Sequence, residues 1–197
     1  MENEEQMGKI KSIAVYCGSS MGKNEVYQQK AIEFAKEMVK RDITLVYGGA
    51  SVGIMGTVAD TVLSLGGKAI GVIPSLLEER EISHKNLTEL YKVETMHQRK
   101  SKMIELADAF VALPGGYGTL EEYAEVFTWS QIGLHAKPCA LFNINNYWQP
   151  LIDMTNKMAD EGFLHEKYRH MAIVNDSPAE LLESFESYVA PPIKTYD

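Results

Sequence analysis

The stretch Leu113-Pro114-Gly115-Gly116-Tyr117-Gly118-Thr119-Leu120-Glu121-Glu122 joins two different patterns in this chain. An apolar run at 109–113 leads into it, and a segment with helical spacing at 122–134 follows it. Together they predict a buried strand, a glycine turn and the start of a helix. Glycines let the backbone turn tightly and approach a ligand closely, and the N–H groups at a helix start attract anions. We therefore expect a phosphate or another anion to bind at this turn.

Apolar runs of strand length alternate with helical segments along the rest of the chain. Strands are expected at 10–16, 43–47, 68–73, 90–94, 109–113, 138–143 and 172–174. Helices are expected at 24–40, 53–65, 96–107, 122–134, 147–161, 166–171 and 178–188, with a charged loop at 78–84. Apolar strands that alternate with helices indicate a parallel sheet covered on both faces. The sequence predicts a single α/β domain over 1–197, a Rossmann-like doubly wound fold, with 1–9 as a flexible tail.

Glycine follows three of the expected strands, at Gly18, at Gly48-Gly49 and at Gly115-Gly116. In a doubly wound fold, ligands bind beyond the carboxyl ends of the strands. We expect these three glycine turns to meet at one edge of the sheet.

Composition limits the classes of function. The 197 residues carry a net charge of −8, which argues against a large nucleic-acid surface. No apolar run approaches the ~18 residues of a membrane span, and the acidic, polar start of the chain does not resemble a secretory signal. The two isolated cysteines, Cys17 and Cys139, predict neither a disulfide framework nor a zinc site. We expect a reduced, cytoplasmic protein without nucleic-acid or membrane partners.

Motifs for common cofactors are missing. No G-x-G-x-x-G fingerprint for NAD or FAD follows the first strand. The run Gly18–Asn24 is one residue shorter than a Walker loop and has Asn where that loop needs Ser or Thr for magnesium. The five histidines do not show metal spacing. No metal or organic cofactor is expected.

Two basic residues, Arg99 and Lys100, lie early in the expected helix at 96–107. An arginine can hold a phosphate or a carboxylate through two parallel hydrogen bonds. The alternative is an ordinary solvated helix face. Because this helix also starts after a strand, it should open at the same edge of the sheet as the glycine turn.

Glu122 has two interpretations. Thr119 and Glu122 have the spacing of a capping box, in which the glutamate bonds back to the N-cap N–H. A carboxylate close to a phosphate site could instead stabilise a cationic, oxocarbenium-like transition state at a sugar carbon or orient water. The residues alone do not decide between the two roles.

The helix at 122–134 has apolar side chains in nearly every direction, and helices of this kind are buried. Its one polar flank carries Glu121, Glu122, Glu125 and Thr128. In so short a chain a second subunit is the natural cover for one side. We predict a homodimer through this region, with the site near the interface.

The run Pro114–Glu122 matches P-G-G-x-G-T-x-x-E, and the chain thereby resembles the LOG ("Lonely Guy") family of cytokinin riboside 5′-monophosphate phosphoribohydrolases, which are often labelled lysine decarboxylases. Further segments that resemble the family are 17–20, 48–56, 80–82 and 96–100. The resemblance covers residues 10–175. It implies a homodimer that hydrolyses the N-glycosidic bond of a nucleoside 5′-monophosphate, a cytokinin nucleotide or AMP, to free base and ribose 5-phosphate.

The resemblance also implies site residues. Substrate binding falls on Glu81, Arg99, Lys100, Gly116, Tyr117, Gly118, Thr119, Leu120, Glu121, Glu122 and Thr128. Arg99 and Glu122 would be the residues essential for turnover. It implies no metal or organic cofactor, and it assigns neither the preferred base nor the group that protonates it as it leaves.

Two competing functions share this fold class. A molybdenum-cofactor carrier or another nucleotide-binding protein would bind its ligand without hydrolysis, and it would not need Arg99, Lys100 and Glu122 together. A DNA-binding protein is disfavoured by the acidic balance of the chain.

Overall fold

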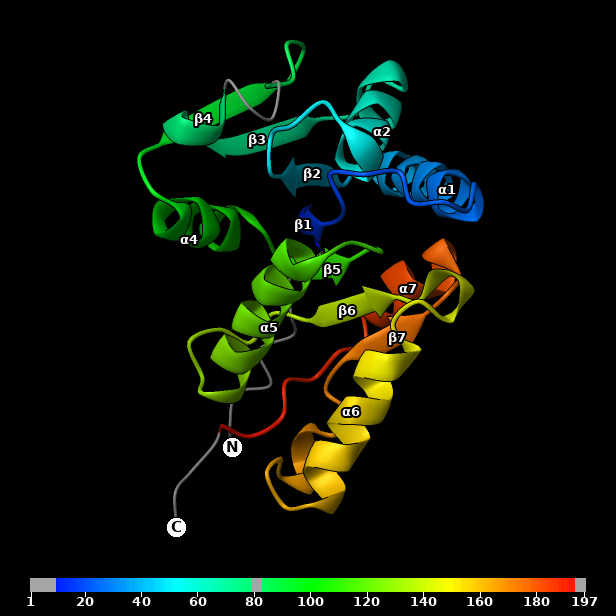
Figure 1. Ribbon diagram of the computed structural model, residues 1–197, viewed down its shortest axis with the longest axis vertical. Coiled ribbons are helices and arrows are strands. Elements are labelled where there is room, and N and C mark those ends of the chain that lie inside the picture. Colours follow the sequence, from blue (N-terminus) through cyan, green and yellow to red (C-terminus); the bar gives the residue numbers. More distant parts are fainter. Residues whose placement is uncertain (1–9, 79–82, 194–197) are drawn as a thin grey trace.

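Seven parallel strands form one sheet in the computed structural model, which describes residues 10–78 and 83–193 (Figure 1). The strand order is β4-β3-β2-β1-β5-β6-β7, and each neighbouring pair is parallel. The strands are β1 (Ser12–Tyr16), β2 (Thr44–Tyr47), β3 (Ala69–Pro74), β4 (Glu89–Val93), β5 (Ala109–Ala112), β6 (Cys139–Phe142) and β7 (Ile173–Asn175). The predicted α/β, Rossmann-like fold is confirmed.

Helices connect the strands and cover the sheet. They are α1 (Val26–Lys40), α2 (Gly53–Ser64), α3 (Ser75–Glu78), α4 (Met96–Leu106), α5 (Tyr117–Gln131), α6 (Gln149–Asp160) and α7 (Pro178–Ser184), with 3₁₀ turns η1 (Ile144–Asn146) and η2 (Glu166–Tyr168). Across residues 10–78 and 83–193, no helix has the length and hydropathy of a membrane span.

The core has two halves, one on each face of the sheet. Alternate residues of β1, such as Ile13 and Val15, pack with α1, α2 and α7, whereas Ala14 and Tyr16 pack with α4 and α5. Figure 1 shows α4 and α5 on the opposite side of the sheet from α1 and α2. Because both faces are covered, the central strands must be apolar on both sides, which explains their unbroken apolar runs.

The strand order reverses between β1 and β5. From β1 the chain builds β2, β3 and β4 outward on one side, and it then returns to build β5, β6 and β7 on the other. The connections that leave the two central strands therefore diverge, and a crevice opens between their carboxyl ends. The turn at Gly18 and the turn at Gly115 both lie at this reversal point.

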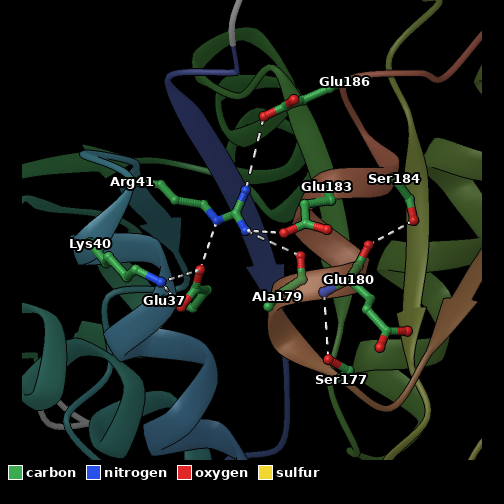
Figure 2. Close-up of polar contacts among 9 residues, drawn as sticks. All are labelled: Glu37, Lys40, Arg41, Ser177, Ala179, Glu180, Glu183, Ser184 and Glu186. Carbon is green, nitrogen blue, oxygen red and sulfur yellow. Dashed lines mark hydrogen bonds and ion pairs between the residues drawn. The ribbon is translucent and has the colours of Figure 1, made fainter.

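An ion-pair cluster ties the end of α1 to α7, elements more than 130 residues apart in the chain (Figure 2). Arg41 donates from Nε to Glu37 at 2.9 Å and from Nη2 to Glu183 at 3.1 Å and to the carbonyl of Ala179 at 3.3 Å. Glu186 lies within 3.9 Å of the same guanidinium. The cluster fastens the last helix to the first.

The expected strands are all found, each within two residues of its predicted bounds. The main error is the start of α5, which begins at Tyr117 rather than at residue 122, with Gly116 as N-cap. The last helix also ends earlier than predicted, at Ser184, and the expected loop at 78–84 is preceded by the short helix α3. The predicted tail 1–9 and the stretch 79–82, which includes Glu81, lie outside the described residues.

Candidate active site

A pocket of about 250 Å³ occupies the crevice beyond the ends of β1 and β5. It is bounded by the loop after β1, the starts of α2, α4 and α5, and α3. Its lining residues are Cys17, Gly18, Ser19, Met55, Leu77, Met96, Arg99, Gly116, Gly118, Thr119, Glu121 and Glu122. Two of the three predicted glycine turns thus line one cavity together with a cation and two carboxylates. The third turn, at Gly48-Gly49, does not line it, although Arg99 of the pocket donates to the carbonyl of Gly48.

The amino end of α5 supplies the backbone donors of this pocket. The first helical hydrogen bond runs from the N–H of Leu120 to the carbonyl of Gly116 at 3.1 Å. The N–H groups of Tyr117, Gly118 and Thr119 therefore have no acceptor within the helix. Since the helix dipole also places partial positive charge at this end, the turn is suited to an anion.

Close packing explains the glycine that follows Pro114. A Cβ on Gly115 would lie 2.1 Å from Oγ1 of Thr119 and 2.8 Å from the backbone nitrogen of Gly18. The N–H of Gly18 in turn donates to the carbonyl of Pro114 at 3.1 Å. The loops after β1 and β5 therefore support each other, and only glycine fits between them.

Thr119 and Glu122 do not form the capping box that their spacing suggested. Gly116 is the N-cap of α5, so Thr119 is already the third helical residue and Glu122 the sixth. No side chain caps this helix start. The capping interpretation of Glu122 is wrong because α5 begins at Tyr117, three residues before the start that an N-cap at Thr119 would give. Glu122 instead lines the pocket.

Arg99 reaches the pocket from the first turn of α4. This helix has a capping box of its own, in which Oγ1 of Thr95 accepts from the N–H of Gln98 and the Gln98 side chain accepts from the N–H of Thr95. Arg99 is only 5% exposed, and its Nη2 donates to the carbonyl of Gly48 at 3.3 Å. A Cβ on Gly48 would lie 2.0 Å from that nitrogen, so the glycine after β2 makes room for the arginine.

Lys100 links α4 to α5 and is not among the residues that line the pocket. Its ammonium group lies 2.5 Å from Glu121 and 3.1 Å from Glu125. Burial acts to lower the pKa of Lys100, but hydrogen bonds to Glu121 and Glu125 raise it above the ordinary value. The lysine therefore stays charged and neutralises part of the acidic flank of α5.

Cys17 lines the pocket beneath Glu122, and the sequence did not single it out as a site residue. Burial and, after it, the negative charge of Glu122 raise the pKa of the Cys17 thiol. The same two effects raise the pKa of Tyr16. Both groups remain neutral, so neither is a nucleophile at neutral pH. The position of Cys17 directly before the first glycine turn is the signal that could have identified it.

Three of the predicted binding residues lie around the outer side of α5. Tyr117 is 90% exposed, and Leu120 and Thr128 line an apolar groove between α5 and α6. Glu81 belongs to the stretch that is not described. Met55, Leu77 and Met96 supply apolar surface inside the pocket that the sequence did not indicate.

A groove of about 320 Å³ runs along α5 and α6, and a second of about 440 Å³ continues it toward the glycine turn. Leu120 and Leu151 line both grooves. Gly116 lines both the second groove and the pocket described above. The apolar surface of α5 thus extends to the edge of the polar pocket.

Among residues 10–78 and 83–193, no three His, Cys, Asp or Glu side chains gather into a group that could hold a metal ion. The polar groups of the pocket include backbone N–H groups and a guanidinium, which donate hydrogen bonds, and two carboxylates, which accept them. Fold and pocket together define a Rossmann-like α/β protein with a pocket suited to an anion at the switch point of its sheet.

Comparison with known proteins narrows this class. Residues 55–185 match the protein family described as "Possible lysine decarboxylase". The chain is 48% identical to the probable cytokinin riboside 5′-monophosphate phosphoribohydrolase LOGL2 of Oryza sativa subsp. japonica, over 91% of this chain and 74% of that protein. It is 46% identical to the cytokinin riboside 5′-monophosphate phosphoribohydrolase LOG1 of Arabidopsis thaliana, over 92% and 85%. The chain belongs to the LOG family, and its match to a family described as a lysine decarboxylase agrees with the label expected from the sequence.

Solved structures support the fold alone. A molybdenum cofactor binding protein from Rippkaea orientalis superposes with a TM-score of 0.67 at 18% identity, covering 90% of this chain and 96% of that one. The molybdenum cofactor carrier protein of Chlamydomonas reinhardtii gives 0.66 at 18%. The chain therefore has the same fold as these molybdenum cofactor proteins, whereas its sequence is similar to those of the LOG proteins.

Proposed function

We propose that this protein hydrolyses the N-glycosidic bond of nucleoside 5′-monophosphates, cytokinin riboside monophosphates or AMP, to a free base and ribose 5-phosphate. The observation that carries the proposal is that one pocket joins an anion-binding helix start to Glu122 and Arg99. The names of relatives with 46–48% identity support the same activity.

The start of α5 can bind the phosphate and the ribose of one nucleotide through different groups. The N–H groups of Tyr117, Gly118 and Thr119 hold the phosphate. Glu122 follows Thr119 by three residues, a rise of roughly 4.5 Å along the helix. A carboxylate at that distance from the phosphate site suits the ribose of the same nucleotide.

Glu122 then acts at the sugar carbon. As the C1′–N bond breaks, positive charge develops on the ribose, and the carboxylate stabilises this charge or orients the water that adds to C1′. The base leaves with a proton. Arg99 remains protonated and cannot serve as that proton donor, so its role is to bind the phosphate or the ribose hydroxyls.

The remaining substrate-binding residues are part of the same proposal, but they differ in where they lie relative to the pocket. Gly116, Gly118, Thr119 and Glu121 face the pocket. Lys100 would reach a substrate only by leaving Glu121 and Glu125, so we expect it to act through these carboxylates. Tyr117, Leu120 and Thr128 would meet substrate from the groove side, and Glu81 stays a prediction.

The alternative, a carrier that binds without hydrolysis, shares the fold but at 18% identity. The combination of Arg99 and Glu122 in one pocket and the identity to the LOG enzymes favour hydrolysis. The two functions differ in whether a base is released.

The test is an assay for free base with AMP and with isopentenyladenosine 5′-monophosphate, each beside its nucleoside. We expect base and ribose 5-phosphate from the monophosphates and little from the nucleosides, because the nucleosides lack the group that the helix start binds. Binding of the monophosphates without release of base would favour the carrier. Equal turnover of the nucleosides would contradict the phosphate site.

A homodimer is part of this proposal. Met154 and Met158 of α6 are exposed and line the two connected grooves along α5 and α6. Contiguous exposed apolar surface of this kind is typical of protein–protein contacts. A second copy of the chain would cover it and bring the partner close to the glycine turn through the shared residue Gly116.

A reduced, cytoplasmic location also remains a proposal. Cys17 and Cys139 are both buried and free, as in a protein that folds without disulfides.

A further inference from the structure

Tyr147 contacts the glycine turn from the side opposite the pocket. It follows η1 in the connection between β6 and α6, and its hydroxyl donates to the carbonyl of Gly115 at 2.5 Å. Tyr147 lines the outer groove rather than the pocket. Nothing in the sequence motif of the site includes it, because it lies 32 residues beyond the turn.

This hydrogen bond fixes the orientation of one peptide group. In a trans peptide the carbonyl of one residue and the N–H of the next point in opposite directions. The carbonyl of Gly115 points to Tyr147, so the N–H of Gly116 points away from it. Gly116 lines both the pocket and the outer groove, and Tyr147 lines only the outer groove, so an N–H that points away from Tyr147 is directed to the pocket side.

Both carbonyls of the turn are held in this way. The carbonyl of Pro114 accepts from the N–H of Gly18, and that of Gly115 accepts from Tyr147. The first contact comes from the loop after β1 and the second from the connection after β6. The second contact bears directly on the Gly115–Gly116 peptide, which joins two residues that lack side chains and so have wide conformational freedom.

The tyrosine ring is itself held firmly. It packs edge-on against Tyr27 at 5.8 Å and against Trp148 at 5.0 Å between ring centroids. Trp148 is anchored in turn, since its Nε1 donates to the carbonyl of Ala112 at 3.2 Å and its N–H donates to Asn143 at 2.7 Å. The hydroxyl of Tyr147 is thus placed by the ends of β5 and β6.

We infer that Tyr147 is a positioning residue of the phosphate site: it orients the Gly115–Gly116 peptide so that the N–H of Gly116 joins the donors at the start of α5. The inference rests on the proposed function only in taking the anion to be the phosphate of the substrate. Tyr147 touches neither the phosphate nor the reacting atoms.

The test compares Tyr147→Phe with Tyr27→Phe, which removes a hydroxyl from the other tyrosine of the same ring cluster. Binding of ribose 5-phosphate is measured by calorimetry, and thermal stability is measured alongside. Loss of one oriented hydrogen-bond donor predicts that Tyr147→Phe weakens binding about tenfold. Because the ring and its packing stay, the melting temperature of Tyr147→Phe should match that of Tyr27→Phe, and Tyr27→Phe should bind normally.

A turnover measurement gives a second readout. For Tyr147→Phe we expect kcat/KM for the monophosphate to fall by about the same factor as binding, with the trace activity on the nucleoside unchanged. Normal ribose 5-phosphate binding in Tyr147→Phe would overturn the inference, as would an equal loss in Tyr27→Phe or a wild-type protein that does not bind the ligand. A wild-type protein that binds ribose 5-phosphate but releases no base would refute only the proposed hydrolysis.

Discussion

Glycines around the pocket serve different purposes at neighbouring positions. Gly48 makes room for the guanidinium of Arg99, and Gly115 makes room for Thr119 and Gly18. A Cβ on Gly118 would instead meet open space, although this residue lines the pocket. Gly115 is required by the packing of the backbone, Gly48 leaves room for the Arg99 side chain, and Gly118 leaves space that a ligand can occupy.

Replacing Gly115 or Gly118 by alanine tests whether each glycine is needed for folding or for ligand binding. Gly115→Ala forces a methyl group against Thr119 and should cost about 1–3 kcal/mol of folding free energy, as overpacking does. Gly118→Ala should leave the melting temperature unchanged or slightly raised, because alanine favours a helix. Its ribose 5-phosphate affinity should nevertheless fall. Thermal unfolding and calorimetry check both variants, and a destabilised Gly118→Ala would contradict the assignment.

Glu122→Gln tests the carboxylate. Since Glu122 does not cap α5, the variant should still fold, and since it lines the pocket, base release should fall by at least ~100-fold, the scale of one catalytic group. Ribose 5-phosphate should still bind. The solvent-facing change Glu33→Gln on α1 serves as the control. Turnover near the wild-type rate would remove Glu122 from the mechanism.

At the scale of elements, α1 and α7 are joined by charge as well as by apolar packing. Partial burial acts to raise the pKa of Glu37, but the hydrogen bond from Arg41 and the charges of Lys40 and Arg41 lower it below the ordinary 4.5. A carboxylate whose pKa is lower in the folded state stabilises the fold above its unfolded pKa. That stabilisation is lost as the pH falls through the folded pKa.

Glu37→Gln should therefore have a pH-dependent effect. At pH 7 we expect a loss of about 1 kcal/mol, the value of a partly exposed charge-assisted pair. Between pH 5 and pH 3 the difference from wild type should shrink, because the wild-type carboxylate is then protonated as well. Denaturant unfolding of the wild type and the variant at several pH values measures this difference in the free energy of unfolding. The exposed pair Lys30–Glu33 offers a matched control in Glu33→Gln, and a difference that grows toward acid would refute the role of Glu37.

At the scale of the whole molecule, α5 faces two environments. Its start lines the polar pocket, and its outer side lines the apolar grooves shared with α6. One helix therefore connects substrate binding with the proposed subunit interface.

Ala124 provides a test of the dimer because it is exposed yet lines the α5–α6 groove. Light scattering of the wild type should give about twice the chain mass of 22.0 kDa. Ala124→Arg should give a folded protein of single-chain mass, since an unpaired charge in an apolar interface is costly. The exposed Gln29→Arg on α1 adds the same charge elsewhere and should stay dimeric. A wild-type protein of single-chain mass at micromolar concentration would refute the dimer.

Most of the architecture could be predicted from local patterns. Runs such as 109–113 are apolar because both faces of the sheet are covered, and this composition is visible without any tertiary information. The convergence of Gly18, Gly48 and Gly115 also followed, since parallel strands place their carboxyl ends at one edge. The start of α5 did not, because the first turn of this helix contains Gly118, and glycine has a low helix propensity, so the stretch reads locally as part of the turn.

The sequence by itself determined the α/β class and the position of the glycine turn at the edge of the sheet, because short-range periodicity and glycine placement encode these features. The candidate pair Arg99 and Glu122 followed from the resemblance of the sequence to the LOG family. Only the tertiary structure decided what each residue does there. In it, Glu122 lines the pocket instead of capping α5, and Lys100 pairs with Glu121 and Glu125. Tyr147 donates a hydrogen bond to the carbonyl of Gly115. These contacts join residues that are distant in the chain, and the packing of the sheet and its helices, rather than any local pattern, sets their distances.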